Sequence, residues 1–286
     1  MEHNPALDQL VSKVKELPGI PDITLKVIRL TDDARASASD VAKVLSEDQT
    51  LTARVLRLVN SAAYGGARQV STVTEATVRL GMRNIRTLAY AASCQDMLAS
   101  PLDGYALTHG ELWRHSYACA LAARTVAVAC GHKRSEEAFV AGLLHDIGKV
   151  LLDTQMKSAY RQVAAIAETD SIPFMDAERK EFGFDHAQAG ALLLQYWSLP
   201  DILVKAVGSH YTPLTQLPFD PLTGIVHVAD IISIMLGIGL GTDGLDYPLE
   251  SQVLDKLGLS DGDFEAILGD TSDLVTAEGL VSSYLS

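Results

Sequence analysis

An imidazole, a carboxylate and an ammonium group interrupt an apolar helical stretch of the chain. His145, Asp146 and Lys149 lie within the run from Glu136 to Leu152, where aliphatic side chains would carry no cost of burial. A neutral imidazole and an adjacent carboxylate are ligands for a divalent metal. Lys149 follows on the same helical face, where it can reach a bound anion. These residues predict a metal site beside a place for an anionic group.

The rest of the chain can build a protein around these residues. It has 286 residues, of which 48% are hydrophobic, and this is ample for a packed core without disulfides. The three cysteines are odd in number, have no CxxC spacing and lie in alanine-rich helical stretches: Cys94, Cys119 and Cys130. We interpret them as small apolar side chains in a reducing compartment.

Helical periodicity recurs throughout the chain, whereas strand patterns are almost absent. Polar residues that typically cap helices precede the apolar stripes at Ser37, Asp48, Thr72, Asp185, Asp220 and Ser260. We therefore expect an all-α protein, organised as a two-lobed bundle of many helices.

The segment Ser100-Pro-Leu-Asp-Gly104 contains both proline and glycine between two long helices, and we expect a hinge between lobes there. The first lobe then covers residues 1–100 and the second residues 101–240. Residues 241–286 contain ten acidic side chains and one basic one, and they predict an acidic helical extension packed on the second lobe.

The net charge of −13 argues against general binding to nucleic acid. Only the first lobe, with 12 basic and 11 acidic residues, could offer a basic face. There Arg79, Arg83 and Arg86 recur at helical spacing, which we interpret as a solvated face with salt bridges rather than a helix-turn-helix.

The sequence has no pattern typical of a signal peptide or a membrane span. The N-terminus lacks a basic stretch followed by an apolar one, and the most apolar segment, Ile225 to Leu240, is short and contains His227 and Asp230. We therefore expect a cytoplasmic protein that does not enter a membrane.

Several motifs resemble known signalling proteins. The segment Gly142-Leu-Leu-His-Asp-Ile-Gly-Lys149 resembles the signature of the HD superfamily, whose enzymes are metal-dependent phosphohydrolases. Three earlier motifs, in the same order, are similar to the first lobe of the HDOD family, the HD-related output domains of bacterial signalling proteins. They are Leu17-Pro-Gly-Ile-Pro21, Glu47-Asp-Gln-Thr-Leu-Thr-Ala-Arg-Val-Leu-Arg-Leu-Val-Asn-Ser-Ala-Ala-Tyr-Gly65 and Glu75-Ala-Thr-Val-Arg-Leu-Gly-Met-Arg-Asn-Ile-Arg86. The resemblance runs from about Leu17 to Leu240 and implies an HD-type helical core in the second lobe.

The resemblance also implies a set of metal ligands. The defining HD ligands would be His115 in Leu-Trp-Arg-His-Ser, the pair His145 and Asp146, and Asp230 in Ile-Val-His-Val-Ala-Asp. HD proteins with a second metal place further histidines where this chain has His186 and His210. If all six converge, Asp146 could bridge two ions, and such nitrogen and oxygen donors suit iron, manganese, nickel or zinc.

Several of these residues also have a purely structural interpretation. His115 could be a hydrogen-bonded core histidine, His186 could sit in the first turn of a helix, and Asp230 could pair with a neighbour. We interpret His227 as structural or as a partner that orients a ligand. Their occurrence together, in the superfamily order, favours metal binding by at least His115, His145, Asp146 and Asp230.

The chain departs from the cyclic di-GMP phosphodiesterases of the HD-GYP type, which carry a His-His pair and a Gly-Tyr-Pro loop. It has Ser209-His-Tyr-Thr-Pro213 and no Gly-Tyr-Pro. The departure removes a ligand and a nucleotide-contacting element, so we expect no hydrolysis of cyclic di-GMP.

Two functions of different classes remain open. In the first, the chain is a signal-transduction or regulatory output module that contacts a signalling protein partner and binds metal, with a nucleotide or phosphate as a possible ligand. In the second, it is a metal-dependent phosphohydrolase of a nucleotide or other phosphate ester, with Asp146 and Lys149 as catalytic residues. We favour the first because the second histidine and the substrate loop are missing. A metal can also be retained because it ties helices together, so metal binding alone would not establish catalysis.

Overall fold

The computed structural model describes residues 10, 19–64, 69–156, 159–242 and 249–280. Within these residues the chain forms helices and no strand, apart from one isolated antiparallel bridge between Leu102 and Leu107. The predicted all-α fold is confirmed. The helices are α2 (Asp22–Asp32), α3 (Ala38–Leu45), α4 (Gln49–Val59), α5 (Val73–Leu80), α6 (Met82–Ala99), η1 (Asp103–Tyr105), α7 (Glu111–Ala129), α8 (Ser135–Leu144), α9 (Ile147–Met156), α10 (Tyr160–Asp170), α11 (Phe174–Phe182), α12 (His186–Tyr196), α13 (Asp201–Ser209), η2 (Pro213–Thr215), α14 (Pro221–Met235), α15 (Ser251–Leu257) and α16 (Asp261–Ala277).

The predicted caps are confirmed. Full capping boxes open α3, α12 and α16, and the carboxylates of Asp48 and Asp220 accept backbone N–H groups at the starts of α4 and α14. Thr72 also caps α5, although the Glu75 carboxylate accepts from the backbone of Ser71 instead of closing a box. Of the predicted motifs, Leu17, Pro18 and Gly65 lie outside the described residues.

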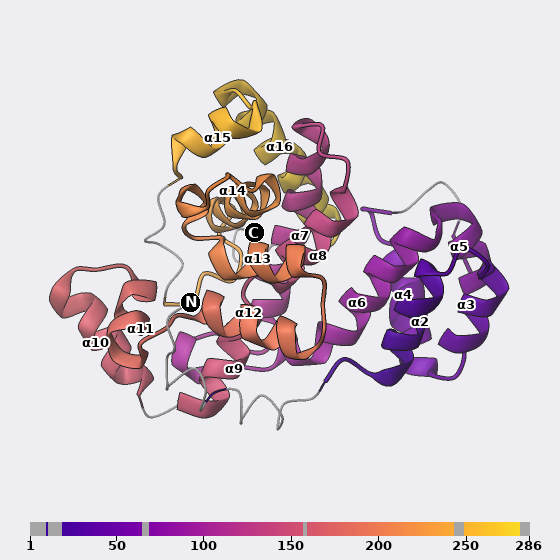
Figure 1. Ribbon diagram of the computed structural model, residues 1–286, viewed down its shortest axis with the longest axis horizontal. Coiled ribbons are helices and arrows are strands. Elements are labelled where there is room, and N and C mark those ends of the chain that lie inside the picture. The colour runs from indigo at the N-terminus through magenta and orange to yellow at the C-terminus, as the bar shows by residue number, and fades with distance from the viewer. Residues whose placement is uncertain (1–9, 11–18, 65–68, 157–158, 243–248, 281–286) are drawn as a thin grey trace.

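Helices α2 to α5 gather at one end of the molecule, and the long helix α6 leads from them into the remainder (Figure 1). Both α2 and α4 pack on α6, which also contacts α7 and α8. One main cluster of buried apolar side chains has members from Leu10 to Leu280 and includes both ends of the molecule. The segment that predicts a hinge is packed, since Leu102 within it and Tyr105 directly after it are buried. The division into lobes at residue 100 stays a prediction.

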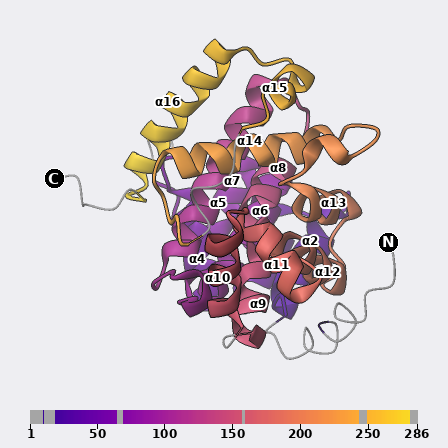
Figure 2. The ribbon, with the colours of Figure 1, turned by 90° about the vertical axis from the view of Figure 1, so that its left-hand side faces the viewer.

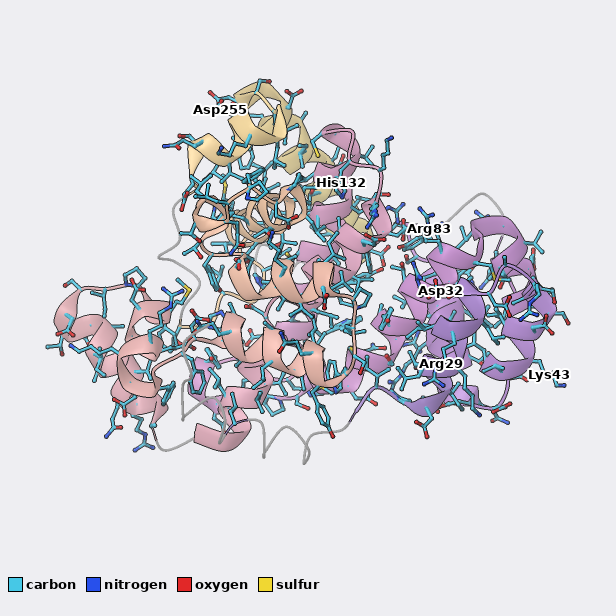
Figure 3. All side chains as sticks on the ribbon, viewed as in Figure 1. Arg29, Asp32, Lys43, Arg83, His132 and Asp255 are labelled. Carbon is cyan, nitrogen blue, oxygen red and sulfur yellow. The ribbon has the colours of Figure 1, made fainter. Side chains whose placement is uncertain are left out.

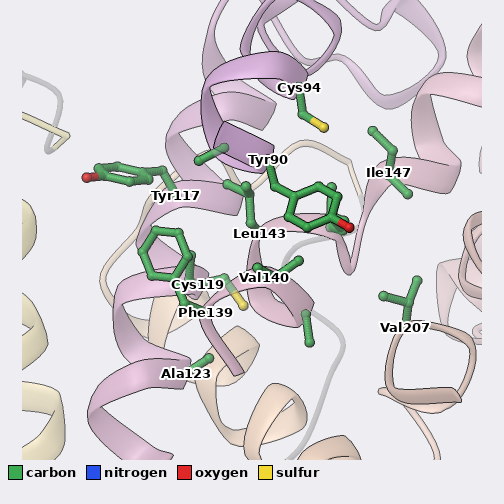
Figure 4. Packing of buried hydrophobic residues seen from close by; sticks show 14 of the residues in the cluster. Tyr90, Cys94, Tyr117, Cys119, Ala123, Phe139, Val140, Leu143, Ile147 and Val207 are labelled. Carbon is green, nitrogen blue, oxygen red and sulfur yellow. The ribbon is translucent and has the colours of Figure 1, made fainter. Parts of the chain in front are cut away.

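Helix α7 lies at the centre of the larger part of the molecule. Helices α8 and α14 pack along it, α16 covers it from another side, and α15 packs on α14 (Figure 2). Small residues let α7 and α8 approach closely, because a Cβ on Gly142 would lie 2.8 Å from the carbonyl oxygen of Cys119. Cys119, Phe139 and Leu143 meet in this interface (Figure 4).

The cysteines behave as apolar side chains. Cys94 and Cys119 are buried, Cys130 is half-buried, and all three are free thiols. Burial raises the pKa of Cys94 to about 11, so this thiol stays protonated at neutral pH.

One predicted helix is two helices. The sequence predicts a single helix through His145 and Asp146, but α8 ends at Leu144 and α9 begins at Ile147. The Nδ1–H group of His145 donates to the carbonyl of Gly142 over 2.7 Å. In a continuous helix this carbonyl would accept a backbone N–H group. Here a side chain is inserted at that place, and such an insertion kinks a helix.

Many charged side chains lie on the surface of the protein. Lys43 on α3 and Asp255 on α15 are exposed and point away from the body of the protein (Figure 3). Arg86 pairs with Asp32 across α6 and α2, a salt bridge of the predicted kind. In the described part of the chain, no helix is both long enough and apolar enough to cross a bilayer.

Candidate metal centre

The six predicted ligands converge from five segments. His115 lies on α7, His145 and Asp146 at the junction of α8 and α9, His186 at the first position of α12, His210 just after α13, and Asp230 on α14. Counted over backbone and side chain together, each residue is at most 4% exposed. Their ligand atoms form three overlapping groups within which all atoms lie within 4.8 Å of one another: His115, His145 and Asp146; His145, His210 and Asp230; and Asp146, His186 and His210.

The backbone fixes which ring nitrogen each histidine turns inward. The Nδ1 atoms of His115, His145 and His210 lie 2.9, 2.7 and 2.7 Å from the carbonyl oxygens of Ile238, Gly142 and Val207. A carbonyl can only accept, so each Nδ1 carries a proton and donates. Each Nε2 is left to face the cluster. An imidazole anchored in this way is typical of a metal ligand.

Five of the six pairs among four donor atoms lie at distances typical of two ligands of one metal ion. The His115 Nε2 is 3.2 Å from the His145 Nε2, 3.1 Å from Asp230 Oδ1 and 3.6 Å from Asp146 Oδ2. The His145 Nε2 is 3.3 Å from Asp146 Oδ2 and 3.4 Å from Asp230 Oδ1. Ligands about 2.1 Å from an ion in tetrahedral coordination are roughly 3.4 Å apart. We call these four residues, His115, His145, Asp146 and Asp230, the tetrahedral group, after the coordination that these five distances fit.

Several polar atoms of the cluster are buried without a hydrogen bond. These are both carboxylate oxygens of Asp146 and the Nε2 of His210. The ammonium of Lys149 lies 2.7 Å from Asp146 Oδ2 and supplies charge to that carboxylate without making a well-directed hydrogen bond. Buried polar atoms without partners are costly, so the Asp146 carboxylate supports a cation as its missing partner, whereas the His210 Nε2 lies outside the tetrahedral group.

The aspartates of the cluster are held in the ionised form, whereas its histidines differ in protonation. Burial alone raises the pKa of Asp230, but His145 and His115 outweigh it and hold that pKa below its usual range. Burial, together with the charge of His145, lowers the pKa of His210 to about 3, so its imidazole is neutral at pH 7. Burial lowers the pKa of His145, but Asp146 outweighs it and raises that pKa well above its usual value. Metals bind the neutral imidazole, so His145 would release a proton on binding a metal.

Close backbone packing positions the cluster. A Cβ on Gly148 would lie 1.8 Å from the carbonyl oxygen of His186 and 2.5 Å from the backbone nitrogen of Gly190, so α9 and α12 touch backbone to backbone. Gly239 has a φ of +58° and lies against His115, which brings the Ile238 carbonyl to the ring. The Nδ1 of His227 lies 3.0 Å from the carbonyl oxygen of His210, so this histidine anchors the backbone of His210.

A second set of buried residues holds His186. The carboxylate of Glu178 accepts from the His186 Nδ1 over 2.7 Å, from the His186 backbone N–H over 2.9 Å and from the Tyr105 hydroxyl over 2.5 Å. The Tyr211 hydroxyl lies 2.9 Å from the His186 Nε2. Burial by itself lowers the pKa of His186, but Glu178 and Asp146 outweigh it and raise that pKa to about 10.

The sequence did not identify Glu178, Tyr105 or Tyr211. Glu178 lies in Ala-Glu-Arg-Lys-Glu, a charged stretch typical of an exposed helix face, so its burial gives no local signal. Tyr211 follows His210, and the sequence showed only that it occupies the place where HD-GYP proteins have a second histidine.

Glu178→Gln is expected to destabilise the protein by about 1–3 kcal/mol. The N–H groups of the new amide would face the hydrogen-bond donors of His186 and Tyr105 in a buried site. Urea unfolding measures the loss. Glu181→Gln, an exposed change one turn along α11, should stay within about 0.5 kcal/mol of the wild type. Equal effects of the two substitutions would contradict the role given to Glu178.

Comparison with known proteins identifies the family. The model of the HDOD domain matches residues 17–213, a range that includes His115, His145, Asp146, His186 and His210 but ends before Asp230. An uncharacterized protein of Treponema pallidum (strain Nichols) is 26% identical over 226 residues, which are 78% of this chain; the chain spans 43% of that relative's length.

Two solved structures are similar over nearly the whole chain. One is a candidate phosphohydrolase of Shewanella amazonensis SB2B, with 28% identity, a TM-score of 0.75 and coverage of 97% of this chain and 99% of that one. The other is an HDOD domain protein of unknown function from Geobacter sulfurreducens, with 27% identity, a TM-score of 0.75 and coverage of 98% and 100%. With the family match over more than half of its length, the chain belongs to the HDOD family.

Proposed function

We propose that this protein is a regulatory output module of bacterial signal transduction that acts on a protein partner and holds a divalent transition metal in its core. The observation that carries the metal is the tetrahedral group, whose donor atoms lie 3.1–3.6 Å apart in the five pairs above. The family match supports the output role.

The donor set narrows the choice of metal. Two imidazole nitrogens and two carboxylate oxygens suit iron, manganese, nickel or zinc better than calcium or magnesium. The four residues come from α7, the junction of α8 and α9, and α14, so a bound ion would tie these segments together. Its binding free energy would then add to the stability of the fold.

The burial of the centre favours a structural ion over a catalytic one. The side chains of His145 and Asp146 are 0% exposed, and those of His115 and Asp230 are 5% and 4% exposed. A hydrolytic metal keeps a coordination position open to water and substrate. A phosphate ester could reach this centre only after the surrounding helices move apart.

One observation favours the second candidate, a metal-dependent phosphohydrolase. The Lys149 ammonium lies 2.7 Å from Asp146 Oδ2, where it could offset negative charge on a phosphoryl group. A divalent ion would supply an activated water to such a reaction. The similar protein from Shewanella amazonensis is also described as a candidate phosphohydrolase.

Thermal unfolding with and without a chelator tests the proposal. Protein purified without a nickel column should lose roughly 5–15 °C in Tm on chelation, and added manganese or zinc should restore it. The metal-loaded protein should not hydrolyse p-nitrophenyl phosphate, bis(p-nitrophenyl) phosphate or nucleoside triphosphates. Turnover that Lys149→Ala abolishes would instead establish the phosphohydrolase, and a Tm that ignores the chelator would contradict a structural ion.

A further inference from the structure

Tyr211 lies on the side of the cluster where a second ion would bind. Outside the tetrahedral group, the group Asp146, His186 and His210 offers the further donors. The Asp146 Oδ1 points to this side and lies 3.4 Å from the His186 Nε2. The Tyr211 hydroxyl lies 2.9 Å from the same Nε2, with the two rings edge to face at 5.1 Å. The side chain of Tyr211 is buried.

The hydrogen bond to Tyr211 occupies His186 in either of its protonation states. The Nδ1 must donate, because its partner is the Glu178 carboxylate. A neutral ring therefore has its only lone pair on Nε2, and that lone pair accepts the Tyr211 hydroxyl proton. A charged ring has no lone pair and donates from Nε2. In either state a metal could bind Nε2 only by displacing this hydrogen bond.

The charge of Asp146 is already shared without a second ion. The Lys149 ammonium lies 2.7 Å from Asp146 Oδ2, the oxygen that the tetrahedral group offers to its ion. A second divalent cation at Oδ1 would divide the attraction of this one carboxylate among three cations. A neutral phenol is a poor ligand for a divalent ion, so Tyr211 does not replace the donor that it blocks.

We propose that Tyr211 sets the metal count of this centre at one, by holding the Nε2 of His186 in a hydrogen bond. This inference rests on the proposed metal centre and adds a residue that decides how many ions it takes. The single ion belongs to the tetrahedral group, and the hydrogen-bonded pair of His186 and Glu178 lies beside it.

Metal counting in tyrosine variants tests the inference. Each protein is stripped by a chelator, loaded with manganese and freed of excess, and its manganese is measured by elemental analysis. The wild type should hold about one equivalent, whereas Tyr211→Phe frees the Nε2 and Tyr211→His adds an imidazole. Both variants should approach two equivalents, and electron paramagnetic resonance should show exchange coupling between two manganese ions.

The chain offers a matched control. Tyr105 is also buried, and its hydroxyl bonds the Glu178 carboxylate rather than the Nε2. Tyr105→Phe should therefore keep one equivalent and an uncoupled spectrum. The double variant Tyr211→His/His186→Ala should return to one equivalent.

The outcomes distinguish a failure of the role given to Tyr211 from a failure of the metal centre itself. Two equivalents in the wild type, or one equivalent in both Tyr211 variants, would overturn the role of Tyr211 and leave the metal centre standing. No manganese in any of the proteins would contradict the metal centre itself, and the inference would fall with it.

Discussion

Asp146→Ala is expected to lower the free energy of unfolding by about 3–5 kcal/mol and to abolish metal binding. The carboxylate of Asp146 faces the Nε2 atoms of His115, His145 and His186, and it lies 2.7 Å from the Lys149 ammonium. Its removal takes away one metal ligand and one carboxylate that lies against the buried Lys149 ammonium. Urea unfolding of the metal-loaded proteins measures the loss.

Asp153→Ala provides the comparison, because it removes a buried carboxylate from the same stretch of α9. Asp153 accepts from the backbone N–H of Gly104 over 2.7 Å and lies outside the three metal-binding groups. Its loss should cost about 1–3 kcal/mol and leave the metal bound. If Asp153→Ala lowered the free energy of unfolding as much as Asp146→Ala, the loss at Asp146 could not be attributed to its place in the metal centre.

Gly148→Ala should be among the most damaging single-methyl additions in the protein. The new Cβ would lie 1.8 Å from the His186 carbonyl oxygen, a backbone atom that cannot rotate away. Helices α9 and α12 must separate, which moves Lys149 and His186 relative to Asp146. Overpacking of this kind costs about 3 kcal/mol. Urea unfolding and the manganese affinity should both report the change.

Gly269→Ala makes the same chemical change where nothing is crowded. Gly269 is exposed on α16, and a Cβ there would have no neighbour within 4 Å. Alanine in a helix interior is more favourable than glycine, so this variant should gain up to about 1 kcal/mol. Equal stability of the two variants would show that α9 and α12 do not meet as closely as described.

The helices could be predicted because their signals are local. Ser37, Asp185 and Ser260 open helices with capping boxes that need only a four-residue pattern. The break after Leu144 could not be predicted in this way. It depends on the His145 ring bonding the Gly142 carbonyl, and the surrounding apolar residues favour a continuous helix.

The residues that form the cluster could be predicted, but their arrangement could not. The resemblance to HD proteins supplied all six candidate ligands, because a motif preserves residue types and their order. It carried no information on Glu178, which reaches His186 from a helix with a charged sequence, or on the hydrogen bond between Tyr211 and the His186 Nε2. Those features depend on how α11, α12 and α13 pack, and such tertiary contacts leave no mark in the local pattern.

Elemental analysis of protein purified without a nickel column is the most direct test of the metal centre. The wild type and Asp153→Ala should each carry about one equivalent of iron, manganese, nickel or zinc per chain, and Asp146→Ala should carry almost none. A wild-type protein without metal that also takes up none when iron, manganese, nickel and zinc are supplied would contradict the account. The tetrahedral group would then be a hydrogen-bonded core of histidines and carboxylates.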